Sequence, residues 1–204
     1  MSYIFKEASY EHLEAIYDLI NMRINWMNEV GIKQWNVTDY WGRYPKEYYQ
    51  HLIDIHELYI LLENDKLLAM AALFTSDIRW PNNDIDAFYV HHLATNPGYK
   101  GIGRVMLKEI ENYAKTIKKV AIRLDCATNN PTLNTYYESQ GYIYKGTCKD
   151  RLYEGNRREK LLWKILKNVL NVIVITSLEL MVMLEDMVLA TISWLVLQSS
   201  RLLK

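Results

Sequence analysis

A glycine-bearing turn joins a predicted strand to a predicted helix within residues 91–107. Its centre reads Lys100-Gly101-Ile102-Gly103-Arg104. Backbone N–H groups in such a turn can bind an anion, because the helix dipole adds positive potential and glycine has no side chain to hold the anion away. The turn lacks the Gly-x-x-x-x-Gly-Lys-Ser/Thr pattern of a Walker loop, and it does not follow the first strand, as a dinucleotide-binding turn does. Taken alone, the pattern is also consistent with an ordinary strand-to-helix turn that binds no anion.

A second group of residues follows about thirty positions later. A predicted strand ends at Asp125, Asn130 opens a predicted helix, and Tyr137 lies four residues before Gly141, which ends that helix. Asparagine is a common helix cap and glycine a common helix stop. Taken alone, this group is also a capped helix with a core tyrosine.

At this separation the two groups together resemble the GCN5-related N-acetyltransferase (GNAT) superfamily. The resemblance is carried by residues 91–97, by Gly101-Ile102-Gly103-Arg104, and by Asn130, Tyr137 and Gly141-Tyr142. It covers residues 3–166 and is most specific in the centre. It implies transfer of an acetyl group from acetyl-CoA, as co-substrate, to a primary amine within a ternary complex, with no metal. The amine would belong to a small molecule or a peptide.

The resemblance also implies where the cofactor binds. Pantetheine would enter a gap between the strand of residues 90–95 and the strand of residues 120–125. Three groups of residues are thereby implied as cofactor-binding: Leu93, Ala94 and Thr95 on the strand, Lys100, Gly101, Ile102, Gly103 and Arg104 at the pyrophosphate, and Asn130 and Tyr137 on the later helix.

The turn departs from the family pattern, which is Gln/Arg-x-x-Gly-x-Gly/Ala within a longer glycine-rich turn. Gly98 stands at the first position of that pattern, or else Lys100-Gly101 opens the longer turn and two residues are missing before Ile102. In either alignment the phosphate loop is abbreviated. Lys100 and Arg104 could compensate as cations or could be solvated.

Acetyl transfer to an amine needs a proton acceptor for the ammonium and a proton donor for the leaving thiolate. Tyr137 is the expected donor, because the resemblance places its phenol near the thioester sulfur. Many relatives carry a Glu on the central strand where this chain has His91, whose imidazole could accept a proton near neutral pH. His92, Asp86 and water are the alternatives. Strand alternation predicts that His91 and His92 face opposite sides of the sheet.

Acceptor recognition is expected in the loop after the first helix and in the turn of residues 79–84. The aromatic residues of that loop could form a wall for a cationic amine, or they could be core: Trp35, Tyr40, Trp41 and Tyr44. Asp77, Asp84 and Asp86 could add negative charge there, or they could be solvated. Cys126 is expected to be a buried, inert thiol.

The elements that must position these residues follow from hydrophobic periodicity. Ser9 is the predicted cap of a long amphipathic helix that Gly31 ends, and a second helix covers residues 45–53. Later helices are predicted after Gly101 and over residues 130–140. Strands are predicted over residues 3–6, 58–63, 67–75, 87–95, 120–125, 142–148 and 160–166, with a hairpin turn at Asn64-Asp65. This order predicts an α/β (α+β) fold with a mixed, partly parallel sheet, centrally splayed as in GNAT proteins and flanked by helices.

The amino-acid composition limits the classes of function that fit this chain. The 204 residues carry 24 Lys and Arg and 24 Asp and Glu, and this balance argues against a nucleic-acid-binding protein. Two cysteines, Cys126 and Cys148, form neither a disulfide framework nor a metal set. Without a recognisable secretory signal at the start, the expected compartment is the cytoplasm.

An apolar extension follows the expected GNAT domain of residues 1–166. In residues 167–204, polar residues recur every seven positions along an otherwise apolar stretch, which predicts a helix that packs on its own domain or forms a homodimer. Membrane contact is less favoured, because the uncharged runs of eleven and fourteen residues are too short to span a bilayer. The alternative functions are therefore a non-catalytic acyl-CoA-binding module and an interaction protein that uses this tail.

Overall fold

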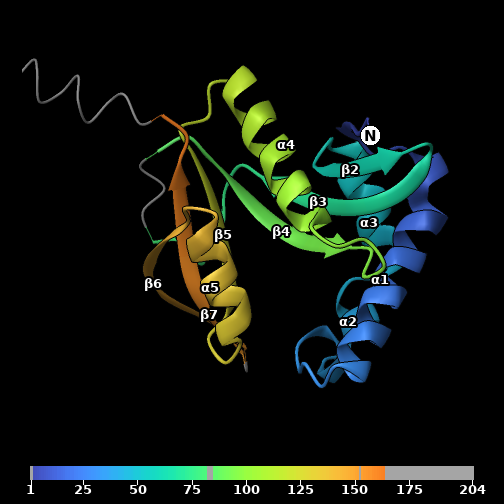
Figure 1. Ribbon diagram of the computed structural model, residues 1–204, viewed down its shortest axis with the longest axis horizontal. Coiled ribbons are helices and arrows are strands. Elements are labelled where there is room, and N and C mark those ends of the chain that lie inside the picture. The colour runs from blue at the N-terminus through green and yellow to red at the C-terminus, as the bar shows by residue number, and fades with distance from the viewer. Residues whose placement is uncertain (1, 82–84, 152, 164–204) are drawn as a thin grey trace, which may run out of the picture. The chain divides into compact units, whose positions relative to one another are not determined.

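A mixed sheet of seven strands in the order β1-β2-β3-β4-β5-β7-β6 forms the centre of the computed structural model (Figure 1). The structure describes residues 2–81, 85–151 and 153–163. The strands are β1 (Ile4–Glu7), β2 (Leu58–Glu63), β3 (Lys66–Phe74), β4 (Ala87–Thr95), β5 (Ala121–Ala127), β6 (Ile143–Asp150) and β7 (Tyr153–Leu161). Among these described strands, β4 and β5 are the one parallel pair; the other neighbours are antiparallel. The predicted mixed α/β fold is confirmed.

Helices cover both faces of this sheet (Figure 1). They are α1 (Leu13–Glu29), α2 (Tyr40–Arg43), α3 (Lys46–Asp54), α4 (Ile102–Thr116) and α5 (Pro131–Ser139), with 3₁₀ turns η1 (Tyr10–His12) and η2 (Trp35–Val37). Ile16 and Ile20 of α1 pack with Ile60 on one face, whereas Met106 and Ile110 of α4 pack with Leu61 on the other. Alternate residues of β2 thus face opposite helical layers, and this explains why the strand is apolar and buried from Leu58 to Leu62.

The predicted cap and end of the first helix and the predicted hairpin turn are confirmed. Ser9 caps the 3₁₀ turn that leads into α1, and Gly31, with a positive φ of 73°, follows its end. Asn64 and Asp65 both have positive φ in the β2–β3 hairpin, as a tight two-residue turn requires.

The last predicted strand is wrong in position. β7 spans Tyr153–Leu161, whereas the hydrophobic pattern predicted a strand over residues 160–166. The true strand was missed because its inner positions are charged. Arg158 and Glu159 are buried there, and Glu159 accepts a hydrogen bond from Arg123 Nε at 2.8 Å and pairs with Lys145 Nζ at 2.9 Å. Ion pairing allows charged side chains to occupy a strand that would otherwise be apolar.

The contacts group Met1–Leu162 and Trp163–Lys204 into two separate units. The predicted extension of residues 167–204 lies outside the described residues, and the division at residue 166 stays a prediction. Within the described part of the chain, no helix is long and apolar enough to cross a membrane.

Candidate active site

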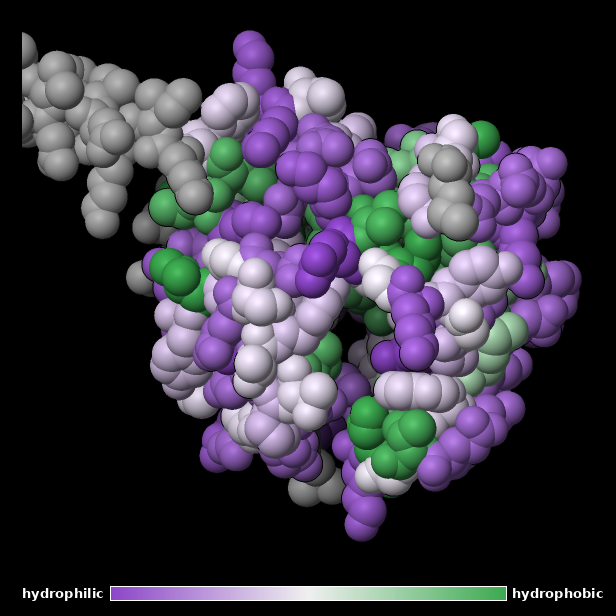
Figure 2. Space-filling view, in the orientation of Figure 1, coloured by the Kyte–Doolittle hydropathy of each residue, from purple (hydrophilic) through white to green (hydrophobic). Residues whose placement is uncertain are grey.

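The sheet opens between its two parallel strands. β4 and β5 pair only at Ala87–Ala121, Phe88–Ile122 and Tyr89–Arg123, and then diverge (Figure 1). The surface is hollowed below β4, between α5 and the helices α1 and α2 (Figure 2). The splayed sheet that the resemblance implied is therefore present, and the second half of β4 borders a gap.

The backbone of β4 directs hydrogen-bonding groups into this gap. The Asn96 N–H donates to Leu68 O at 2.8 Å, so Asn96 faces β3. Because the backbone groups of alternate residues in a strand point to the same neighbour, Ala94 also faces β3, while Leu93 and Thr95 face the gap. Two of the three predicted strand contacts thus have exposed backbone groups on the gap side. The Ala94 side chain lies in the core under α1 and α3.

A β-bulge changes the faces of the two histidines. Ala72 pairs with His91 and Met70 with Ala94, so His92 and Leu93 together lie opposite Ala71. His92 has a positive φ of 51° at this point. A bulge adds one residue to a strand and shifts the alternation of its side chains. The prediction that the histidines face opposite sides is therefore wrong: both line one pocket, with ring centroids 6.3 Å apart.

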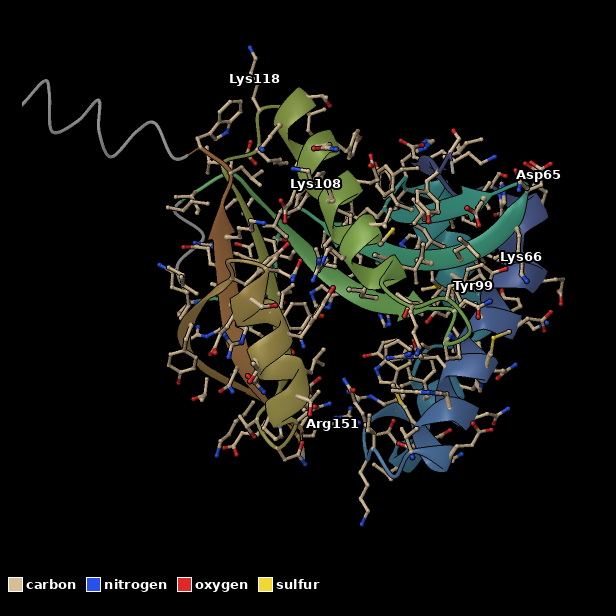
Figure 3. All side chains as sticks on the ribbon, viewed as in Figure 1. Asp65, Lys66, Tyr99, Lys108, Lys118 and Arg151 are labelled. Atoms are coloured by element: carbon tan, nitrogen blue, oxygen red, sulfur yellow. The ribbon has the colours of Figure 1, made fainter. Side chains whose placement is uncertain are left out.

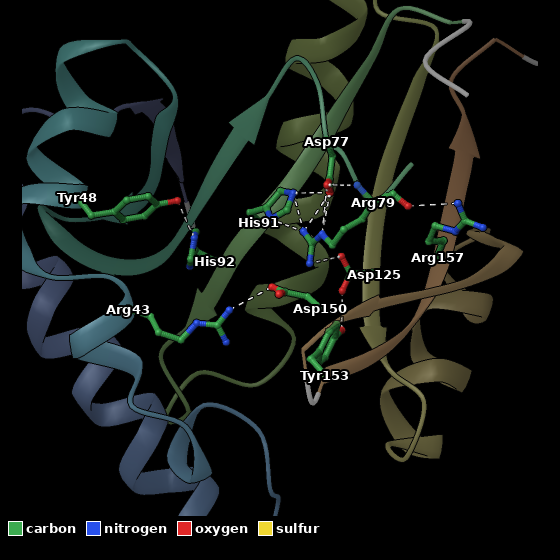
Figure 4. A network of polar contacts seen from close by, with 10 residues as sticks. All are labelled: Arg43, Tyr48, Asp77, Arg79, His91, His92, Asp125, Asp150, Tyr153 and Arg157. Carbon is green, nitrogen blue, oxygen red and sulfur yellow. Dashed lines mark hydrogen bonds and ion pairs between the residues drawn. The ribbon is translucent and has the colours of Figure 1, made fainter. Parts of the chain in front are cut away.

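This pocket has a volume of about 390 Å³. Its walls come from four parts of the chain: Tyr44 and Tyr48 near α3, the end of β3 with the following loop, the two histidines, and Lys149-Asp150 at the end of β6. Asp150 receives a hydrogen bond from Arg43 at 3.1 Å, which joins α2 to the β6–β7 hairpin beside the pocket (Figure 4).

A chain of charged groups lies along the floor of the pocket (Figure 4). His91 Nε2 lies 2.9 Å from Asp77 Oδ2, and Asp77 also pairs with Arg79 at 3.0 Å. Arg79 Nη1 reaches Asp125 Oδ1 on β5 at 3.1 Å, and Asp125 accepts a hydrogen bond from the Tyr153 hydroxyl at 2.5 Å. Burial raises the pKa of Asp77, but hydrogen bonds from His91 and Arg79 outweigh this effect and hold the pKa well below its usual value.

These contacts define the tautomer of His91. Arg79 can only donate, and its Nη2 lies 2.8 Å from His91 Nδ1. Asp77 as a carboxylate can only accept, so the proton of the neutral ring belongs on Nε2 and the lone pair on Nδ1. Arg79 Nη2 also lies 3.0 Å from Nε2, so it contacts both ring nitrogens.

His92 has different neighbours. Its Nδ1 lies 3.1 Å from the Tyr40 hydroxyl and its Nε2 lies 3.0 Å from the Tyr48 hydroxyl. Tyr40 in turn contacts the Tyr49 hydroxyl at 2.6 Å. Burial lowers the pKa of His92 to about 3, helped by the charges of His91 and Arg79. His92 is therefore neutral at physiological pH, with both nitrogens bound to phenols.

Tyr137 is buried on α5, within the core shared with α4. Burial raises the pKa of its phenol far above the usual value, whereas the charge of Arg23 on α1 acts to lower it. The phenol thus keeps its proton at neutral pH.

The abbreviated turn leads directly into α4. Gly101 caps the helix with a φ of 81°, which glycine adopts without strain, and Asn96 Oδ1 accepts a hydrogen bond from the Gly98 N–H at 3.0 Å. Lys66 lies 5.0 Å above the Tyr99 ring and braces the turn against the β2–β3 hairpin (Figure 3). Among the predicted residues, Lys100, Gly101 and Arg104 are exposed, Gly103 is partly buried, and the Ile102 side chain is core.

Asn130 caps α5 and lies at the edge of a second cavity. Its Oδ1 accepts a hydrogen bond from the Leu133 N–H at 3.0 Å. It also lines a cavity of about 330 Å³ together with residues 31–33, which follow α1. The predicted helix cap is confirmed.

Comparison with known proteins agrees with this geometry. The model of the acetyltransferase (GNAT) family matches residues 22–142, which is more than half of the chain. The chain belongs to the GNAT family. The uncharacterized N-acetyltransferase YesJ of Bacillus subtilis (strain 168) is 23% identical to it over an alignment of 154 residues, and the match covers 68% of this chain and 81% of YesJ.

Two solved structures share the GNAT fold. An acetyltransferase of Listeria monocytogenes 4b F2365 superposes with a TM-score of 0.65 at 21% identity, covering 78% of this chain and 94% of its own. The PaiA N-acetyltransferase of Thermoplasma acidophilum, solved with coenzyme A, superposes with a TM-score of 0.63 at 19% identity, covering 79% and 99%.

In this GNAT chain the expected acceptor wall is only partly present. Tyr44 lines the pocket, but Tyr40 is buried beside His92, and Trp35 and Trp41 pack against the core under α1. Tyr48 lines the pocket instead. It was not identified from the sequence, because its position next to Tyr49 on α3 gave no separate signal.

The three aspartates expected near the acceptor do not all line the pocket. Asp77 is in the pocket, whereas Asp86 pairs with Lys119 near the start of β5 and does not line it. Asp84 lies outside the described residues. Cys126 is buried as predicted, and burial raises the pKa of its thiol.

Proposed function

We propose that this GNAT protein is an N-acetyltransferase that moves the acetyl group of acetyl-CoA onto a primary amine by direct transfer in a ternary complex. The observation that carries the proposal is the gap between β4 and β5, with Tyr137 on the α5 side and the pocket of His91 on the other. One ligand can then enter along β4 while a second reaches the same point from the pocket.

The residues at the gap fit the cofactor. Leu93 and Thr95 direct backbone groups into it, as the amides of a pantetheine arm require. A Cβ added at Gly101 would meet no atom within 4 Å, so the space above the turn is open. Ile102 and Gly103 begin α4, and the first N–H groups of a helix have no partner within the helix. These groups would hold a diphosphate, with Lys100 and Arg104 as flanking cations and Asn130 on the opposite wall.

Acetyl-CoA supplies the activated thioester, whose thiolate is the leaving group. As the amine nitrogen forms its bond to the acetyl carbon and the C–S bond breaks, Tyr137, which holds its proton at neutral pH, donates that proton to the departing thiolate. The proton that the new amide nitrogen loses then restores the phenol. Backbone N–H groups of β4 at the gap stabilise the negative charge that develops on the acetyl oxygen.

His91 accepts the proton of the incoming ammonium, directly or through water. Its lone pair is on Nδ1, because Asp77 holds the Nε2 proton, and the Arg79 contact at Nδ1 must yield for the transfer. The negative charge of Asp77 then stabilises the imidazolium. Asp77 and Arg79 are positioning residues in this scheme, since both act through His91.

The proposal is tested by thiol release from acetyl-CoA with a panel of small amines, amino acids and peptides. Replacing Tyr137 with Phe is expected to lower turnover about a hundredfold or more, because a general acid contributes on the order of 10²–10⁴-fold. Binding of acetyl-CoA, measured by thermal shift, is expected to stay the same. Tyr144→Phe is the matched control, because Tyr144 is exposed on β6.

Three outcomes would count against the proposal. Equal turnover in both variants would remove the role of Tyr137. Binding of acetyl-CoA without thiol release for any amine would favour a non-catalytic acyl-CoA-binding module, in line with the abbreviated turn. Absence of any thermal shift in the folded protein would overturn acetyl-CoA as the ligand.

A further inference from the structure

Tyr136, the neighbour of Tyr137 on α5, carries a buried hydroxyl that no described residue binds. Its oxygen is inaccessible to solvent and has no hydrogen-bond partner in the described part of the chain. Buried polar groups almost always have a partner, and leaving one without a partner costs on the order of 1–3 kcal/mol. A tyrosine here, rather than a phenylalanine, therefore needs an explanation.

The side chain of Tyr136 reaches from α5 to the first turn of α4. A Cβ built at Gly103 would lie 3.4 Å from the Tyr136 hydroxyl and 3.7 Å from Thr95 Cγ2. The hydroxyl thus lies where β4 ends and α4 begins, beside the second glycine of the abbreviated turn. A Cβ at position 103 would be in ordinary van der Waals contact with this oxygen. The phenol therefore lies beside the backbone donors of Ile102 and Gly103 and adds an O–H donor to them.

We propose that Tyr136 is a further cofactor-binding residue: its hydroxyl, covered in the free protein, turns toward bound coenzyme A and donates a hydrogen bond to an anionic diphosphate oxygen. The inference rests on the proposed function, because it takes coenzyme A as the ligand. It also explains how an abbreviated turn can hold a diphosphate: a side chain from the facing helix replaces a donor that the missing residues would have provided.

The inference predicts opposite effects of Tyr136→Phe on the free protein and on binding. The ring contacts with α4 stay, and a hydroxyl without a partner is removed, so the free protein should unfold at the same temperature or higher. Affinity for coenzyme A should fall on the order of tenfold to a hundredfold, because a hydrogen bond to a charged group is lost. A purely structural tyrosine would not show this combination.

The experiment compares the wild type, Tyr136→Phe and the exposed control Tyr144→Phe by calorimetric titration with coenzyme A and with pantetheine, which lacks the diphosphate. The expected result is a loss specific to Tyr136→Phe with coenzyme A, with pantetheine affinity unchanged. Equal affinity of all three proteins for coenzyme A would overturn the role of Tyr136 and leave the proposed function standing. Equal losses for both ligands would place the hydroxyl on the pantetheine arm and overturn the assignment to diphosphate. A wild type that does not bind coenzyme A would overturn the proposed function itself.

Discussion

His91 and His92 are adjacent in the sequence and face one pocket, yet their partners give them different chemistry. His91 meets a carboxylate that can stabilise its protonated form. Among the described residues, His92 hydrogen-bonds two phenols and no carboxylate, and its burial disfavours a positive charge. The residue suited to accept a proton is therefore His91, while His92 holds Tyr48 in the wall of the pocket.

The neutral state of His92 predicts an acid-sensitive contribution to stability. An unfolded histidine titrates near pH 6.5 and folded His92 near pH 3, so the unfolded state binds more protons between these values. The stabilisation is complete above about pH 6.5 and is lost as the pH falls toward 3. Between pH 7 and pH 4 the contribution should amount to about 2–3 kcal/mol, measured by urea unfolding.

His92→Asn tests this prediction, because asparagine tolerates a positive φ better than most residues. The variant should be less stable than the wild type at pH 7 and should lose less stability on acidification. His56→Asn is the matched control, since His56 also has a positive φ of 58° but is largely exposed. If His92→Asn lost stability with pH as steeply as the wild type, His92 would not be the titrating group.

Much of the candidate site could be predicted at the residue scale, because the family pattern ties Asn130, Tyr137 and the turn to fixed positions. The side of the sheet that His92 faces could not be predicted. Alternation is a property of a regular strand, and one added residue reverses it without a sequence signal of its own.

Among the elements, β4 has the most distinctive arrangement, because one edge pairs with β3 from Tyr89 to Thr95 on both sides of the bulge while the other loses its partner after Tyr89. Binding of acetyl-CoA is expected to slow amide hydrogen exchange at Leu93 and Thr95, whose N–H groups face the gap. Ala94 should change little, since its N–H already faces β3. At a ligand concentration a hundred times Kd, exchange through the free form falls up to about a hundredfold.

Hydrogen exchange with mass spectrometry or NMR checks this alternation within a single strand. Uniform protection of all three residues would indicate general stabilisation rather than a ligand paired along β4. A control with an unrelated nucleotide of similar charge in place of acetyl-CoA separates the protection by the ligand from an effect of ionic strength.

The positions of the strands could be predicted from the sequence where their buried residues are apolar. The prediction failed where the buried residues are charged and paired. β2 and β3 are continuous apolar runs, and the hydrophobic pattern identified both. In β7 the charged residues Arg158 and Glu159 are buried, so the same pattern placed the strand at residues 160–166 instead. Charged residues can be buried in β7 because ion-pair partners on other elements neutralise them. Those partners come close only once the sheet is assembled.

Across the described part of the molecule, the two parts of the sheet on either side of the gap meet along a short stretch of strand pairing. Three residue pairs connect β4 with β5, and Arg79 adds ion pairs to Asp77 on its own loop and Asp125 on β5. Such a link brings together residues 46 positions apart, Arg79 and Asp125, which local sequence could not reveal. The pocket therefore depends on long-range pairs that only the folded chain defines.

Arg79→Met is expected to destabilise the protein by about 3–5 kcal/mol, because it leaves two buried carboxylates without their cation. The side chains of Asp77 and Asp125 are 6% and 10% exposed. Arg43→Met is the matched control: its pair with Asp150 is 32% and 42% exposed, and the loss should be below about 1 kcal/mol. Equal losses in urea unfolding would contradict the role of Arg79 as the link between the strands.

The bulge in β4 also has a consequence for how this pocket can be gained or lost. If His92 is removed from the strand, the remaining residues alternate without interruption: Phe88, Val90 and Leu93 toward α4, and Tyr89, His91 and Ala94 toward the opposite layer. His92 is thus a one-residue insertion into an otherwise regular strand. A deletion of this single codon would preserve both core faces while it removes one imidazole from the pocket, so chain length alone can alter the chemistry at this site.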